Sequence, residues 1–284
     1  METSVTRFAE WGRQWARTVD PFNLVYAAGV AILVIWLLRT SLGRCSLVRA
    51  PVRRNHIHPA VVILALMVYM LVPPYAMIPV RSRLAGHPPW HIDLAANLVM
   101  SLCGLATACI ALVISWRGFA RRLKGLGLRW AGLPRDLVHA CVAFLAILPP
   151  FLAMVQVTVW AGQSVRGPTY QMEQHRELQL LQDCPHWSLA ASIVVTAVVV
   201  APLVEELLFR GLVQSTIRSW VDRPWSAIAV TSLFFALIHQ NVEHWPALFV
   251  LGAGMGYAYE RSGSLWQPIL IHALFNGTTI LSSL

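Results

Sequence analysis

VVTAVVVAPLVEELLFR, residues 194–210, places two glutamates and an arginine directly behind an apolar run. With the apolar residues that precede it, the run is long enough to cross a bilayer as a helix. A charged group at the centre of a span costs at least about 2.5 kcal/mol, so charges rarely occur there by accident. The stretch therefore predicts a transmembrane helix whose charged end has a structural or chemical task.

The rest of the chain has the same apolar character. Of its 284 residues, 57% are hydrophobic and only 12% are charged, whereas soluble domains carry roughly 25% charged residues. Apolar segments of spanning length occur at 22–39, 59–80, 92–116, 136–160, 188–213, 225–242, 245–260 and 264–283. We expect an all-α, polytopic integral membrane bundle of about eight transmembrane helices.

These segments are expected to form one membrane domain in two parts. Residues 1–187 hold transmembrane helices 1–4 with interfacial segments, including a short helix near the N-terminus and an amphipathic helix at 168–183. Residues 188–284 hold helices 5–8 and the charged residues that lie within apolar runs.

The net charge of +9 does not indicate a nucleic-acid partner, because nearly all basic residues lie in short loops between apolar runs. Loops 39–58, 117–135, 214–224 and 260–263 are the more basic set and are expected to face the cytoplasm. All basic residues except Lys124 are arginines, which favours a bacterial source and so a multi-pass protein of the bacterial cytoplasmic membrane.

The first polar motif is Glu205-Glu206-Leu207-Leu208-Phe209-Arg210. Glu206 and Arg210 are four residues apart, so they share one face of a helix and can pair. Glu205 points about 100° away and is the unpaired carboxylate. It is a candidate general base that takes a proton from water. A Glu–Arg clamp without catalysis is the structural alternative.

Two further motifs follow in the next apolar runs. Phe235 and His239 share one helical face, and so do His272 and Asn276. One carboxylate, one histidine, and a second histidine beside an amide make a hydrolytic set: a base, a residue that orients water, and donors for an oxyanion. Taken singly, each of these residues could instead form hydrogen bonds that hold helices together.

The order EExxxR at 205–210, FxxxH at 235–239 and HxxxN at 272–276 resembles the CPBP family of intramembrane proteases, also called ABI. That family includes the type II CAAX prenyl endopeptidases and proteins linked to bacteriocin processing and self-immunity. The resemblance covers roughly residues 188–284. It implies that Glu205 and His239 activate water, that His272 and Asn276 stabilise the oxyanion, and that Glu206 and Arg210, with Phe235, support the site.

The sequence leaves two alternatives for the cofactor, a zinc ion or no metal. Glu205, His239 and His272 could supply a zinc site with water in the fourth position. The sequence has no HExxH motif, and Asn276 suits an oxyanion site better than a metal, so we expect a metal-free enzyme.

The sequence thus predicts an intramembrane endopeptidase that acts on a peptide or a membrane-anchored protein, with membrane lipids as its other partners. The alternative is a non-proteolytic membrane protein, such as a scaffold, immunity factor or transporter, whose buried polar cluster is structural.

Overall fold

The computed structural model describes residues 20–48, 50–51, 55–183, 186–239 and 241–284. Across this part of the chain the secondary structure is helical, apart from one isolated β-bridge between Asn55 and Phe119. The expected all-α membrane bundle is therefore confirmed as a fold class. The interfacial helix expected near the N-terminus falls in residues 1–19, outside the described residues.

The helices are bounded as follows. The first half of the chain contains α2 (Pro21–Arg39), α3 (Pro59–Arg83), α4 (Pro89–Gly118), α5 (Arg122–Leu126), η1 (Trp130–Gly132), α6 (Leu133–Arg166) and α7 (Arg176–Asp183). The second half contains α8 (Trp187–Val195), η2 (Thr196–Val200), α9 (Ala201–Glu206), η3 (Leu207–Gln214), α10 (Ser215–Trp220), α11 (Pro224–Leu237), η4 (Val242–His244), α12 (Trp245–Ser262) and α13 (Trp266–Ser283).

Local sequence explains where several helices begin and end. Proline stands in the first turn of α2, α3, α4, α6, α11 and α12, where its missing N–H is not needed. The Asp20 side chain accepts a hydrogen bond from the Phe22 amide and caps α2. Gly263 ends α12 with φ +69°, a left-handed conformation that favours glycine.

Segments α8 to α10 form one continuous helix from Trp187 to Trp220. Two stretches of it, η2 and η3, have π-helical hydrogen bonding. Such wide turns are rare in proteins, and many of those that occur lie at functional sites. Glu205 and Glu206 end α9, immediately before the second π-stretch, so the helix changes its pitch where the predicted site begins.

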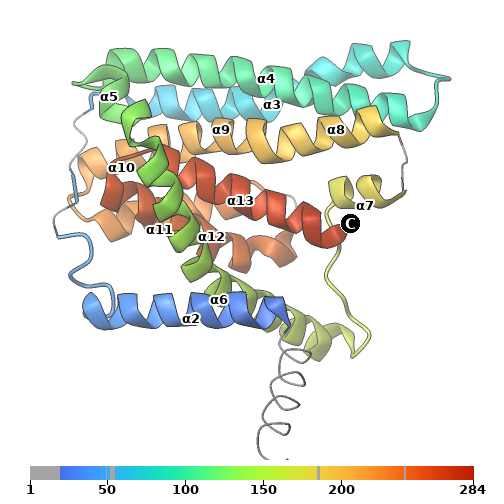
Figure 1. The fold of residues 1–284 in the computed structure, drawn as a ribbon. Coiled ribbons are helices and arrows are strands. Elements are labelled where there is room, and N and C mark those ends of the chain that lie inside the picture. Colours follow the sequence, from blue (N-terminus) through green and yellow to red (C-terminus); the bar gives the residue numbers. More distant parts are fainter. Residues whose placement is uncertain (1–19, 49, 52–54, 184–185, 240) are drawn as a thin grey trace, which may run out of the picture.

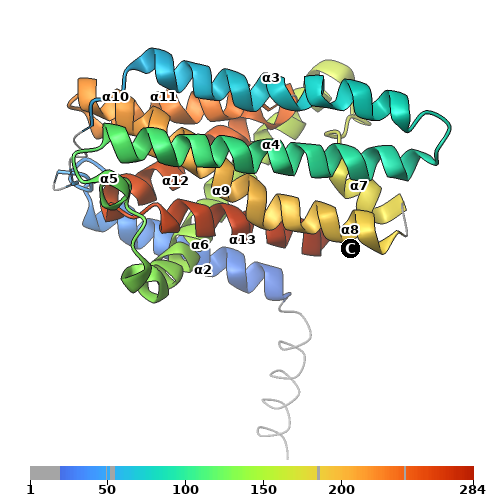
Figure 2. The ribbon, with the colours of Figure 1, turned by 90° about the horizontal axis from the view of Figure 1, so that it is seen from above.

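The helices lie side by side in layers (Figures 1 and 2). Helices α3 and α4 pair on one side of the bundle, and the continuous α8–α10 helix packs against α4. Next come α11, α12 and α13, with α6 crossing them obliquely. Helix α2 lies on the far side from α3 and packs mainly on α6.

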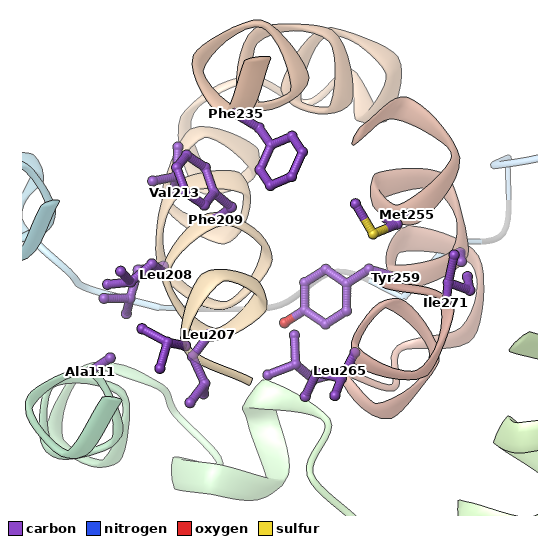
Figure 3. Packing of buried hydrophobic residues seen from close by; sticks show 14 of the residues in the cluster. Ala111, Leu207, Leu208, Phe209, Val213, Phe235, Met255, Tyr259, Leu265 and Ile271 are labelled. Carbon is purple, nitrogen blue, oxygen red and sulfur yellow. The ribbon is translucent and has the colours of Figure 1, made fainter. Parts of the chain in front are cut away.

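The tightest packing surrounds η3, α11 and α12. Phe209, Phe235 and Tyr259 are fully buried there, and their rings lie between the surrounding helices in Figure 3. By contrast, α2, α3 and α4 turn many large apolar side chains outward. That outer apolar surface suits a lipid environment, so the protein is an integral membrane protein.

Five helical segments are long and apolar enough to cross a membrane: α2, α3, α4, Arg122–Arg166 and Trp187–Trp220. Helix α11 is apolar but has only 14 residues. Helices α12 and α13 have 18 residues each. The count of eight spans and the division into two parts therefore stay predictions.

Two of the expected segments extend beyond the helices that the structure shows. The span expected at 225–242 ends at Leu237, because polar residues follow and the Asn241 side chain accepts from the Glu243 amide to start η4. The amphipathic helix expected at 168–183 is confined to Arg176–Asp183, since Gly167 and Pro168 open that loop and favour turns.

Two glycines allow a test of the packing between α5 and α12. Gly127 and Gly86 both have positive φ, at +93° and +89°. A methyl group on Gly127 would also meet the Gly263 carbonyl oxygen, whereas one on Gly86 would meet nothing within 4 Å. We expect Gly86→Ala to lower the free energy of unfolding by about 1 kcal/mol, the cost of left-handed backbone. Gly127→Ala should cost clearly more, as measured by SDS titration in mixed micelles; equal losses would contradict this packing.

Candidate functional site

Glu206 and Arg210 form a buried ion pair inside the bundle. The Arg210 Nη1 donates to Glu206 Oε1 at 2.7 Å, and both side chains are 0% exposed. Arg210 Nη2 also donates to the Gly252 carbonyl at 3.0 Å, and its guanidinium lies 4.7 Å from the centre of the Phe235 ring. Arg210 therefore joins η3, α11 and α12, with hydrogen bonds and a cation–π contact offsetting its burial.

Glycine is needed where α12 meets this arginine. A side chain on Gly252 would begin 3.1 Å from Ser232 Cβ on α11, which is closer than most such contacts. The missing side chain lets the two helices approach, and the buried Gly252 carbonyl accepts from Arg210.

His272 on α13 binds the same carboxylate oxygen. Its Nδ1 lies 2.9 Å from Glu206 Oε1, and since a carboxylate only accepts, Nδ1 carries the proton. In the neutral ring, Nε2 is then an acceptor. Nε2 lies 4.0 Å from Glu205 Oε2, beyond direct hydrogen-bond distance.

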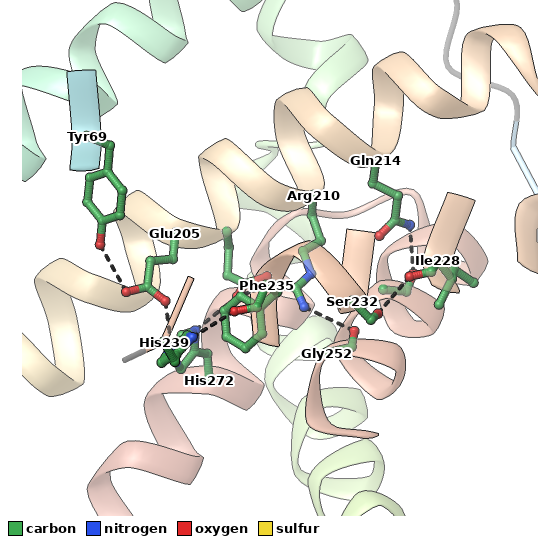
Figure 4. A network of polar contacts seen from close by, with 12 residues as sticks. Tyr69, Glu205, Arg210, Gln214, Ile228, Ser232, Phe235, His239, Gly252 and His272 are labelled. Atoms are coloured by element: carbon green, nitrogen blue, oxygen red, sulfur yellow. Dashed lines mark hydrogen bonds and ion pairs between the residues drawn. The ribbon is translucent and has the colours of Figure 1, made fainter. Parts of the chain in front are cut away.

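Glu205 has one oxygen bound and one without a partner. Oε1 accepts from the Tyr69 hydroxyl at 3.0 Å, whereas Oε2 is buried and has no hydrogen-bond partner among the described residues. Figure 4 shows Tyr69 and His272 on opposite sides of this carboxylate. When His272 is neutral, two acceptors, Glu205 Oε2 and His272 Nε2, face each other across a 4.0 Å gap.

Sequence reasoning missed Tyr69. The residue lies in the middle of α3, in the part of the chain that carries none of the three motifs. The available signal was its depth, because tyrosines of membrane proteins gather at the interfaces and a mid-span hydroxyl needs a partner.

His239 lies just beyond the end of α11. Its Nδ1 is 2.7 Å from the Phe235 carbonyl oxygen, and its ring centre is 4.9 Å from that of Phe235. The Phe235 ring also contacts His272, at 5.8 Å between ring centres. In the described part of the chain no direct hydrogen bond joins His239 to Glu205, so Phe235 is the shared neighbour of the two histidines.

Asn276 makes a bond between helices. Its Nδ2 donates to the Ala197 carbonyl in η2 at 2.7 Å. Asn276 lies one turn along α13 from His272, and this contact joins α13 to the π-helical stretch η2. One Nδ2 hydrogen is occupied in this way, and the amide keeps a second hydrogen.

The suggested zinc ligands do not form a ready metal site. Within the residues that the structure describes, no group of three His, Cys, Asp or Glu side chains is placed to hold a metal ion. Each imidazole Nδ1 is bound, His239 to a carbonyl and His272 to Glu206, which leaves the two Nε2 atoms as the possible ligands. Since the set of Glu205, His239 and His272 does not fit a metal as it stands, we derive no step through one.

Residues 187–278 match the family model described as type II CAAX prenyl endopeptidase Rce1-like. The chain is 26% identical to the membrane-embedded CAAX protease MroQ of Staphylococcus aureus over 147 residues, which cover 50% of this chain and 55% of MroQ. It is 38% identical over 81 residues to an uncharacterized 24.3 kDa protein of Escherichia coli, covering 27% of this chain and 37% of that protein.

These alignments span between about a third and about half of the relatives' lengths. No solved structure matches the chain. The resemblance to CAAX proteases predicted from the three motifs is confirmed over the helices that carry them.

The buried pair gives a test of stability. Arg210→Met would leave the Glu206 carboxylate buried without its cation, so we expect a loss of about 3 kcal/mol or more in the free energy of unfolding. Arg176→Met is the matched control, because the Arg176–Asp93 pair lies at the surface with Arg176 70% exposed. That variant should lose at most about 1 kcal/mol.

The double variant Glu206→Gln/Arg210→Met removes both charges and should recover part of the loss. SDS titration of the purified variants measures all three values. An Arg210→Met variant as stable as Arg176→Met would show that the buried pair does not stabilise the bundle more than a surface pair does.

Proposed function

We propose that this protein is an intramembrane endopeptidase of a bacterial cytoplasmic membrane, hydrolysing a peptide bond near or within the bilayer by direct attack of water. The observation that carries the proposal is the gap between Glu205 Oε2 and His272 Nε2. The match to CAAX proteases and the MroQ relative support the reaction class. The substrate is a peptide or a membrane-anchored protein.

The gap suits one water molecule. Both atoms that face it are acceptors, so neither can satisfy the other, and a water has two hydrogens to give. With hydrogen bonds of about 2.8 Å to each atom, a water bridges a 4.0 Å separation at an angle of about 90°, so both hydrogen bonds are slightly bent. Its lone pairs are then left for the carbonyl carbon of a substrate.

Glu205 is the general base in this scheme. The carboxylate takes a proton from the water as its oxygen attacks the carbonyl carbon, and the proton passes on to the leaving amine nitrogen. The products are a carboxylic acid and an amine, which exchange the remaining proton to become a carboxylate and an ammonium; one water is consumed and no acyl-enzyme forms. Tyr69 holds the other oxygen of Glu205 and so fixes the direction of Oε2.

His272 is held for its role by Glu206. A carboxylate bound to Nδ1 fixes the tautomer and orientation of an imidazole, as in hydrolases with an Asp–His pair. As the water attacks, Nε2 takes its second hydrogen as a proton, and His272 then donates that proton to the oxyanion. The second amide hydrogen of Asn276, one turn along α13, is the other donor that we assign to it.

His239 completes the set from the end of α11. Its Nδ1 donates to the Phe235 carbonyl, so the neutral ring offers Nε2 as an acceptor. A water has only two hydrogens, so we assign this nitrogen to orient the water together with Glu205 as the alternative to His272 Nε2; the Phe235 ring lies beside both histidines.

Loss of the base tests the proposal. In membranes from cells that express the chain, Glu205→Gln should abolish the peptide fragments that wild type produces, a loss of at least about a hundredfold. Glu177→Gln, at an exposed position of α7, should leave the fragments unchanged. Mass spectrometry of membrane peptides measures both, and undiminished cleavage by Glu205→Gln would exclude Glu205 as the base.

Tyr69→Phe refines the same experiment. It keeps the carboxylate and removes one hydrogen bond to it, so we expect cleavage to slow by about tenfold, the worth of one such bond. If Glu205→Gln and Tyr69→Phe alter folding alone, and wild type yields no fragments, the polar cluster is structural and the chain is not a peptidase.

Metal independence is a separate prediction. Because the proposed chemistry uses only side chains and water, incubation of the purified protein with 1,10-phenanthroline or EDTA should leave the cleavage rate unchanged. Loss of activity that zinc restores would contradict this and would assign Glu205, His239 and His272 as ligands.

A further inference from the structure

A hollow lies away from the polar cluster, between α2, α6 and α12. Its volume is about 540 Å³, within the range of ligand sites. Most of its lining is apolar and includes Leu33 of α2, Ile147 of α6 and Val250 of α12. None of the residues assigned to catalysis lines it.

Helix α12 separates this hollow from the proposed catalytic site. Its residues Ala253, Tyr257 and Arg261, spaced four apart, line the hollow. A different face of the same helix carries Gly252 and Gly256, whose carbonyls accept from Arg210 and Gln214 in η3. The two sites therefore use different faces of one helix.

One end of the hollow is cationic. Arg135 and His139 of α6 and Arg261 of α12 line it there. Arg261 also borders a second, more polar hollow with Cys45 and Ser46, and its Nη1 donates to the Ser46 carbonyl at 3.2 Å. The apolar and the polar hollow therefore share Arg261 in their linings, on the side of the bundle predicted to face the cytoplasm.

The positive charge at this end is not compensated within the described residues, where neither Arg135 nor Arg261 forms a salt bridge. The neighbouring Asp136 is buried and engaged elsewhere. It accepts from Ser264 at 2.6 Å and from Gln267 at 2.9 Å. Arg135 and Arg261 are both exposed and leave a net positive charge here that an anion can match.

Aromatic side chains border the hollow between these two regions. Trp36 Nε1 donates to the Tyr257 hydroxyl at 2.7 Å, and the Trp225 ring stacks on Tyr257 at 5.7 Å between centres. Tryptophan and tyrosine take such positions at the level of lipid headgroups. From one end of the hollow to the other, the lining therefore changes from apolar side chains to aromatic side chains and then to the two arginines.

We propose that this hollow is a binding site for one anionic phospholipid of the bilayer. An acyl chain lies along the apolar wall, and the phosphate binds Arg135 and Arg261. Basic pockets between transmembrane helices at the cytoplasmic side bind anionic headgroups by the same attraction, and arginine offers a planar fork that fits phosphate. This site does not depend on the proposed peptidase activity.

The test uses the full chain reconstituted in vesicles of equal parts phosphatidylglycerol and phosphatidylcholine. After mild detergent extraction and washing, mass spectrometry measures the phospholipid retained per protein. Wild type should retain phosphatidylglycerol in preference to phosphatidylcholine. Arg135→Gln/Arg261→Gln should lose the preference, by about fivefold for each arginine removed. Arg117→Gln/Arg121→Gln, an equal charge change at exposed positions outside the hollow, should keep it.

A second variant tests the tail region. Ala253→Trp fills the apolar part without altering charge, and it should lower the amount of both retained lipids. Circular dichroism and gel filtration check that each variant is folded. The proposal is overturned if the Arg135/Arg261 variant retains lipid as wild type does, if the control pair loses the preference equally, or if the hollow is instead closed by a second copy of the chain and no lipid is retained.

Discussion

A buried ion pair, Glu206 with Arg210, is the constraint on which the interior of this protein depends. Neither side chain reaches solvent, so each must find its partners within the bundle. Arg210 takes the Gly252 carbonyl and Glu206 takes His272. One pair on one helix thereby fixes how α12 and α13 dock on η3, and the small residues of α12 follow from that closeness.

The same constraint leaves Glu205 as the reactive group. Its neighbour in sequence is neutralised by Arg210, whereas Glu205 has a hydroxyl on one oxygen and no cation beside it; its other oxygen, like Glu206 Oε2, has no hydrogen-bond partner within the described chain. Tyr69 comes from α3, outside residues 187–278, which match the CAAX protease family model. The N-terminal helices therefore contribute more than a hydrophobic frame, because one of them supplies a contact to the proposed base.

Much of this arrangement was predictable from the sequence, and the missed parts have physical reasons. Spacing of four residues on a helix identifies the Glu206–Arg210 pair, and apolar length identifies the long spans. Counting depth along ideal upright helices does not place His239, because α11 is short and ends before it. Contacts between distant helices, such as Asn276 with Ala197 and Tyr69 with Glu205, depend on packing that no local pattern encodes.

The central claim is that a water lies between Glu205 and His272, ready for attack. An experimental structure of the full chain, at a resolution that shows ordered water, tests it most directly. We predict a water within hydrogen-bond distance of Glu205 Oε2 and His272 Nε2, with Tyr69 on the other carboxylate oxygen. A metal ion bound by Glu205, His239 and His272, or a gap closed by direct contact of the two side chains, would contradict the account.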